Sequence, residues 1–275
     1  MGGLTRSWSL ARASWSVLTR EPALVIFPVL GGALTLLASL AFILPAIWVT
    51  AATGGRFESA ENFPAIFLLF AFYLVTSFIA LFFNVGLAAV VLRRFRGQEG
   101  AIGDGFAVAV KNLPLIFLFA VINAVVGTLL AQLERRGALG DFVRGLIGTT
   151  WSVATFLVVP VMVAEGIDPF AAIKRSAALV RQTWGAQIAG NVGLGLVTFL
   201  AILPGVALIA LGAISNRLEL LIPLFVVGII WIAIVAVASA TLGQIYRVAV
   251  YLFAASGEAP APFDRGLLAS SFRAT

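Results

Sequence analysis

The chain alternates between long apolar stretches and short polar connections. Six stretches are long enough to cross a hydrocarbon core, which takes about 20 helical residues. They cover residues 23–52, 64–92, 114–133, 142–164, 186–211 and 220–253. The first far exceeds the roughly 7–15 apolar residues of a secretory signal peptide, so we expect it to be retained as a span. The pattern therefore predicts an all-α integral membrane protein whose six transmembrane helices form three helical hairpins.

The composition agrees with a membrane protein. Hydrophobic residues make up 61% of the chain and charged residues 11%, whereas a typical soluble domain has about 25% charged residues. The bilayer must therefore be the solvent. The net charge of +6 does not indicate nucleic acid, because the basic residues flank apolar spans, where they set topology and contact anionic lipid. We expect membrane lipids as partners, and no nucleic acid.

The distribution of Lys and Arg predicts the orientation. With six spans, 13 of the 18 basic residues lie on the side that holds both termini, and 5 lie opposite. The five are Arg56, Arg135, Arg136, Arg144 and Arg217. Under the positive-inside rule, this split predicts a multi-pass protein with both termini in the cytoplasm.

Two decamers of one form lie far apart in the chain. "RSWSLARASW" begins at Arg6 and "RSAALVRQTW" at Arg175, and both fit R-S-x-x-L-x-R-x-[S/T]-W. Each carries an apolar stripe at helical spacing beside a basic face. The stripes are Leu4, Trp8, Ala11, Trp15 and Leu18 in the first, and Phe170, Ile173, Ala177, Val180 and Trp184 in the second. Asp168 and Pro169 precede the second as N-cap and first-turn residues.

Such helices are typical of the membrane interface, with Trp at headgroup depth and Arg facing phosphates. The predicted headgroup contacts are Arg6, Arg12, Trp15, Lys174, Arg175, Arg181 and Trp184. The alternative is that both decamers form short cytosolic helices that pack on the bundle and touch little lipid. A calmodulin-like partner is a third and weaker interpretation.

The segments after the even-numbered spans also resemble one another. The chain turns at a glycine (Gly97, Gly166 or Gly257) and then reaches a Phe that opens a polar segment (Phe106, Phe170 or Phe263). This pattern predicts tandem units, each an amphipathic helix followed by a transmembrane hairpin. Within one membrane domain over 1–275, the units cover 1–97, 98–166 and 167–257, and 258–275 is an interfacial tail.

Three stretches carry a resemblance to a known family. They are "SWSVLTREPALVIFPVL" from Ser14, "VVPVMVAEGIDPFAAIKRSAALVRQTWG" from Val158 and "FDRGLLASSF" from Phe263. With them, nearly the whole chain resembles an uncharacterised prokaryotic family of six-span proteins, related in pattern to the membrane domain of some glycerophosphodiester phosphodiesterases. The resemblance implies a six-helix protein of the prokaryotic cytoplasmic (inner) membrane. It implies no activity, since the sequence holds no soluble phosphodiesterase domain.

The sequence offers little chemistry. Histidine and cysteine are absent, which removes the commonest general base and thiolate metal ligands. "GAIGDG" before Phe106 is Gly-rich but follows no strand, so it is interpreted as a loop. We therefore expect no catalytic residues, no metal and no cofactor, and a protein that is not an enzyme.

Polar residues within or beside the spans are few. They are Asn84, Asn123, Gln132, Glu165, Gln187, Asn191, Gln244 and Arg247. Asn84 and Gln244 occupy equivalent places in the repeat and are predicted to hydrogen-bond between helices. Glu165 and Arg247 lie near the cytoplasmic ends of their spans. They either pair across the bundle or are separately solvated, with Arg247 snorkelling.

Small residues predict that spans five and six pack closely. They are Ala186, Ala189, Gly190, Gly193 and Val197 in span five, and Ala236, Ala240 and Gly243 in span six. Prolines within the spans predict kinks that leave room for a central cavity. These are Pro28, Pro45, Pro160, Pro204 and Pro223.

Taken alone, the sequence favours a non-catalytic structural or scaffold protein that associates with itself or with a partner. The alternative is a transporter or lipid-handling protein with an apolar substrate, because the middle of the spans is nearly all apolar and suits a lipid better than an ion. A cavity open to lipid would favour the alternative, and a tight bundle with a large self-contact would favour the scaffold.

Overall fold

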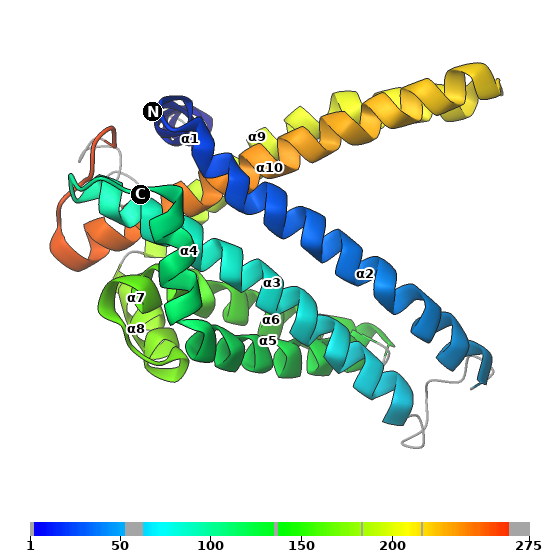
Figure 1. Ribbon diagram of the computed structural model, residues 1–275, viewed down its shortest axis with the longest axis horizontal. Helices are drawn as coiled ribbons and strands as arrows, with labels where there is room; N and C mark the ends of the chain where they lie inside the picture. Colours follow the sequence, from blue (N-terminus) through cyan, green and yellow to red (C-terminus); the bar gives the residue numbers. More distant parts are fainter. Residues whose placement is uncertain (1–2, 53–62, 135–136, 183, 216, 264–275) are drawn as a thin grey trace. The chain divides into compact units, whose positions relative to one another are not determined.

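The computed structural model describes residues 3–52, 63–134, 137–182, 184–215 and 217–263. Side chains at 3–8, 134, 137–139, 182 and 184–194 lie outside this description. The described elements are α1 (Gly3–Arg20), η1 (Pro22–Val25), α2 (Ile26–Ala52), α3 (Phe63–Phe95), α4 (Ile102–Lys111), α5 (Leu113–Glu134), α6 (Gly137–Thr155), α7 (Val158–Glu165), α8 (Pro169–Gln182), α9 (Trp184–Ile214) and α10 (Leu218–Ser256) (Figure 1). All are helical, which confirms the all-α prediction.

Six helical stretches of the described chain are long and apolar enough to cross a membrane. They are Pro22–Ala51, Phe63–Phe95, Leu113–Leu133, Gly140–Glu165, Gly195–Ile214 and Leu218–Ser256. Each overlaps one of the predicted spans, so the six-span prediction is confirmed. The last helix has 39 residues and is about 58 Å long at ~1.5 Å per residue. Because this length exceeds the hydrocarbon core, α10 must tilt or extend out of the membrane.

Three glycines end helices, as the sequence indicated. Gly97, Gly166 and Gly257 have φ angles of 73°, 66° and 74°. This left-handed conformation is accessible to glycine without the Cβ clash that other residues meet. The amide of Gly166 donates to the Met162 carbonyl at 3.0 Å, and that of Gly257 donates to the Phe253 carbonyl at 2.9 Å. The turns after α3, α7 and α10 therefore follow from single residues.

Span four is broken in its second half. Helix α6 ends at Thr155 and α7 begins at Val158. Pro160 lacks the N–H that would bond the Phe156 carbonyl, which accounts for the break just before it. The amide of Leu157 instead donates to the hydroxyl of Ser176 on α8 at 3.1 Å, and this hydroxyl is buried. A side chain of the amphipathic helix thus replaces a missing backbone partner.

The other prolines do not interrupt their helices. Pro45, Pro204 and Pro223 lie inside α2, α9 and α10, which continue through them. Neighbouring groups and small backbone adjustments let membrane helices tolerate proline in this way.

The described chain divides into two compact units. One comprises Met1–Pro28, Arg94–Gln98 and Arg181–Thr275, and the other Val29–Arg93 and Glu99–Val180. The division of the sequence into three tandem units concerns the repeat rather than this grouping, and it stays a prediction.

In the first unit, α9 and α10 form an antiparallel pair (Figure 1). A Cβ added at Gly228 would lie 2.7 Å from the Gly205 carbonyl oxygen, and one at Gly205 would lie 3.0 Å from the Gly228 carbonyl oxygen. The two backbones are therefore in contact, with no space for a side chain. The predicted joining of spans five and six holds, but its closest point differs. A Cβ at Gly243 would meet nothing within 4 Å, and 186–194 lie outside the described side chains.

Helix α1 packs on α9 and α10 within the same unit. It buries Leu10, Ser14 and Leu18, which recur every fourth residue and so lie on one face. The C-terminal part of α10 is also buried, from Thr241 to Tyr251 with few exceptions. The core of this unit therefore lies where α1 meets the ends of the last hairpin.

The second unit has its core around the C-terminal half of α3. Buried residues run almost without a gap from Leu81 to Leu92. Phe106 of α4 contacts this region, with its ring 6.3 Å from that of Phe82 and 6.1 Å from that of Phe83. Ala172 and Leu179 of α8 are buried as well. The short helices of this unit thus have a face packed against protein.

Candidate functional site

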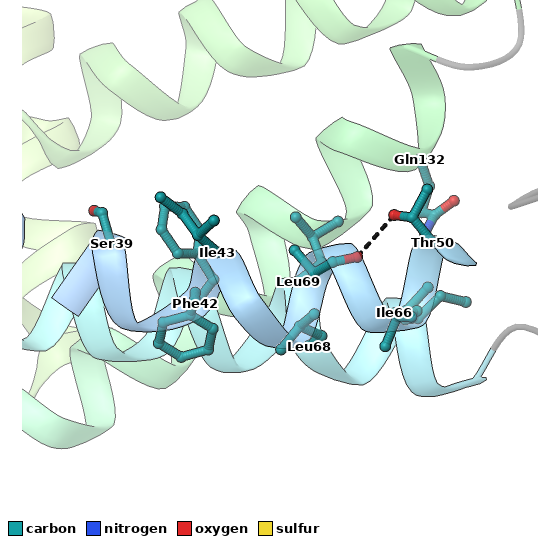
Figure 2. Close-up of a pocket in the computed structure, with 12 residues that line it drawn as sticks. Ser39, Phe42, Ile43, Thr50, Ile66, Leu68, Leu69 and Gln132 are labelled. Carbon is teal, nitrogen blue, oxygen red and sulfur yellow. Dashed lines mark hydrogen bonds between the residues drawn. The ribbon is translucent and has the colours of Figure 1, made fainter. Parts of the chain in front are cut away.

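A cavity of about 310 Å³ lies in the second unit, between the C-terminal half of α2 and the N-terminal half of α3 (Figure 2). Its lining is Ser39, Phe42, Ile43, Ala46, Val49 and Thr50 of α2, Ala65, Ile66, Leu68, Leu69 and Phe72 of α3, and Gln132 of α5. Nearly all of these side chains are apolar. The cavity therefore offers van der Waals contact rather than charge to an occupant.

Local packing explains why this space is open. The rings of Phe42 and Phe72 meet edge to face at 5.6 Å, while Ala46 and Ala65 leave room beyond them. The two hydroxyl groups of the lining donate to their own helix. Ser39 donates to the Thr35 carbonyl at 2.8 Å. Thr50 donates to the Ala46 carbonyl at 2.8 Å (Figure 2). Such bonds are the usual way for a hydroxyl to be satisfied within a membrane helix.

A second cavity of about 330 Å³ lies between α5 and α6 of the same unit. It is lined by Val126, Leu129, Leu130, Gln132 and Leu133 of α5 and by Ile147 of α6. Gln132 thus lines both cavities, and its amide can donate two hydrogen bonds and accept others. The sequence showed Gln132 as a polar residue in a span, but it gave no sign of the cavities on either side.

Ion pairs tie the ends of spans to the segments beside them. Arg93 and Arg94 at the end of α3 pair with Asp104 of α4 at 3.6 Å and with Glu21 at 3.1 Å, respectively. The guanidinium of Arg175 donates to Glu165 at 3.2 Å, joining α8 to the end of α7. All these side chains are partly exposed, so each pair contributes at most about 1 kcal/mol. They join the ends of spans to the adjoining segments.

The residues predicted to contact headgroups have varied environments. Arg12, Lys174 and Arg181 are exposed. Trp15 is 51% exposed, and Arg175, also exposed, pairs with Glu165. The predicted contacts at Arg6 and Trp184 lie outside the described side chains.

The Leu and the second Arg of the two decamers have matching exposure. Leu10 and Leu179 are 0% and 1% exposed, whereas Arg12 and Arg181, two residues further on, both face outward. The packed face differs from the predicted stripes, because it includes Ser14 and Ser176 and leaves Trp15 out. Phe170, also in a predicted stripe, is 56% exposed. Periodicity located an apolar stripe, but the neighbouring helices decide which side of it is covered.

The residues that were predicted to make polar contacts between helices have different environments in the structure. The Asn84 side chain donates to the Ala80 carbonyl in its own helix at 2.8 Å. Gln244 is 1% exposed, and neither end of its amide has a hydrogen-bond partner among the described residues. Glu165 pairs with Arg175 and belongs to one unit, while Arg247 belongs to the other. The Glu165–Arg247 pair therefore stays a prediction.

One polar contact between helices was not singled out from the sequence. The indole N–H of Trp151 on α6 donates to the Asn123 side-chain oxygen on α5 at 3.3 Å. An Asn within a span was the available signal, but its partner is a residue that sequence reasoning treats as apolar. This bond holds together the helices that flank the second cavity.

These helices and cavities define an all-α, multi-pass membrane protein. The chain belongs to a family of unknown function, DUF6159, which it matches over residues 64–261. No curated protein and no solved structure matches the chain. The resemblance to the membrane domain of some glycerophosphodiester phosphodiesterases, and the prokaryotic origin that came with it, stay predictions.

Proposed function

We propose that the protein is a non-catalytic, lipid-handling membrane protein that holds an acyl chain in the cavity between α2, α3 and α5. The observation that carries this proposal is the cavity itself, which has a volume of about 310 Å³, is lined by membrane-spanning residues and is open on one side. Ligand sites in proteins commonly measure about 300–1,000 Å³. The ligand would enter from the bilayer, where acyl chains are the most abundant occupant.

The lining supports an apolar ligand rather than an ion. An ion site needs several oxygen ligands or charges directed at one point. Here the two hydroxyls of the lining donate to backbone carbonyls of α2. An acyl chain would restore the dispersion contacts that an empty apolar cavity lacks.

This proposal departs from the scaffold function that the sequence favoured, because a scaffold needs no apolar cavity open to lipid. The non-catalytic part rests on the absence of histidine and cysteine from the sequence. We further propose that the protein lies in the prokaryotic inner membrane with both termini in the cytoplasm. The distribution of Lys and Arg supports that orientation.

Lipid retention tests the proposal. The protein is extracted in a mild detergent, and bound lipid is measured by native mass spectrometry. Ala46→Phe places a ring in the cavity, and Ala41→Phe on the exposed surface of the same helix is the matched control. We expect the wild type and Ala41→Phe to retain lipid and Ala46→Phe to lose it at least fivefold. Ala65→Phe, which fills the cavity from α3, repeats the test with different packing.

Equal lipid retention by all four proteins would overturn the proposal. A self-associated, lipid-free protein would instead favour the scaffold.

We also propose that Arg12 and Arg181 contact anionic headgroups. Their matching exposure in the two decamers supports this, since each follows a buried leucine at the same spacing. An arginine near an anionic surface contributes about 1 kcal/mol, which screening by salt reduces.

The test measures enrichment of anionic lipid around the full-length protein in mixed bilayers. Removing both charges with Arg12→Gln and Arg181→Gln should lower the enrichment several-fold at low salt. Arg144→Gln, on the predicted outer side, should change it little. A loss that persists unchanged at high salt would contradict a headgroup contact.

A further inference from the structure

The apolar lining indicates an apolar ligand, and the position of Gln132 indicates a further property of that ligand. Gln132 lies near the end of the third span and lines the two cavities described above, one toward α2 and α3 and the other toward α6. An uncharged amide is thus flanked on two sides by apolar space. The two volumes, about 310 and 330 Å³, are nearly equal.

The Gln132 side chain is half-buried and forms no hydrogen bond with the described residues that line the two cavities. Ser39 and Thr50, the other polar residues lining these cavities, donate to carbonyls of their own helix. Gln132 is the penultimate residue of the third span, so its amide lies near the membrane interface, where the ester groups of lipids also lie. A ligand that carries a hydrogen-bonding group to this position would satisfy the amide.

We propose that the ligand is a two-chain glycerolipid, with one acyl chain in each cavity and an ester carbonyl accepting a hydrogen bond from the Gln132 amide. This inference rests on the proposed function. Two apolar cavities on either side of one amide suit two chains that diverge from an ester-linked glycerol. A single-chain lipid would leave one cavity empty, and the residues lining it would lose their dispersion contacts.

Competition between lipids tests the number of chains. A phospholipid with two ester-linked chains and the corresponding single-chain lysophospholipid are offered in equal amounts to delipidated full-length protein, and bound lipid is read by native mass spectrometry. We expect the two-chain lipid to be preferred about tenfold. Val126→Phe fills only the second cavity and should remove this preference while single-chain binding persists. Val125→Phe, on the exposed face of α5, is the control.

A comparison of ester with ether lipid tests the role of Gln132. A diether lipid has the same two chains and headgroup but no carbonyl. The wild type should prefer the diester lipid several-fold. Gln132→Leu, which keeps a side chain of similar size without the amide, should bind the two lipids equally.

The outcomes separate this inference from the proposed function. If Val126→Phe keeps the two-chain preference, or Gln132→Leu keeps the ester preference, while Ala46→Phe still loses lipid, the two-chain assignment is wrong and acyl-chain binding stands. If Ala46→Phe retains lipid as the wild type does, the proposed function itself fails.

Discussion

The hydroxyl of Ser176 supplies a partner that the backbone of span four lacks. The helix is interrupted before Pro160, where the Val153 carbonyl accepts the Phe156 amide at 3.3 Å. The Leu157 amide donates to the Ser176 oxygen on α8 at 3.1 Å. Within the hydrocarbon core, no water is present as an alternative acceptor for such an amide. This serine is the second residue of the R-S-x-x-L decamer, so one motif position fixes an amphipathic helix to a span.

Replacing that serine should therefore destabilise the fold. Ser176→Ala leaves the buried Leu157 amide without an acceptor, at an expected cost of about 1–3 kcal/mol. The exposed Ser152→Ala on α6 is the control and should change stability by less than about 0.5 kcal/mol. Both are measured as free energies of unfolding in detergent. Equal stabilities of the two variants would mean that Leu157 finds another acceptor.

The positions where helices begin and end were easier to predict from the sequence than the contacts between helices. The N-cap at Asp168 is confirmed, since its carboxylate accepts the amides of Phe170 and Ala171 at 2.9 and 3.1 Å. Helix ends depend on a few adjacent residues, which a sequence displays. The seam between α9 and α10 at Gly205 and Gly228 depends on how two helices are aligned, and small residues elsewhere in both spans offered several candidates.

The close contact of α9 and α10 at Gly228 predicts that alanine destabilises the protein there but not at Gly195. Gly228→Ala would bring a Cβ to 2.6 Å from the Ile209 side chain and 2.7 Å from the Gly205 carbonyl oxygen, so the helices must separate. Overpacking of this kind costs about 1–3 kcal/mol. Gly195→Ala on α9 meets nothing within 4 Å and should not destabilise. Thermal unfolding in detergent compares the two, and a stable Gly228→Ala would show that the seam adjusts without cost.

For the whole molecule, the class of protein could be predicted from the sequence, whereas its cavities could not. Span length and apolar composition are properties of single segments, and all six spans were predicted. The cavity depends on Ala46, Ala65 and Gln132 meeting from three helices. No periodicity in one segment indicates which residues of another lie opposite. A polar residue in an apolar span was the visible sign of Gln132, and it did not reveal what surrounds the amide.

The topology is testable because the chain has no cysteine. A single cysteine introduced beside Arg56 or Arg217 should react with an impermeant thiol reagent from outside the cell. One introduced beside either terminus should react only after the membrane is opened. Outside labelling of a terminal cysteine would contradict the arrangement that the Lys and Arg distribution predicts.

The length of α10 has a mechanical consequence. Most of its apolar N-terminal part faces outward, whereas its C-terminal part is buried and contacts α1. If α1 lies at the membrane interface as proposed, the depth of Arg12 and Trp15 would depend on how far α10 protrudes. A long helix responds to a thinner bilayer by tilting further. Such tilting would shift α1 relative to the phosphates, so the proposed headgroup contact of Arg12 would depend on bilayer thickness through the packing of α1 on α10.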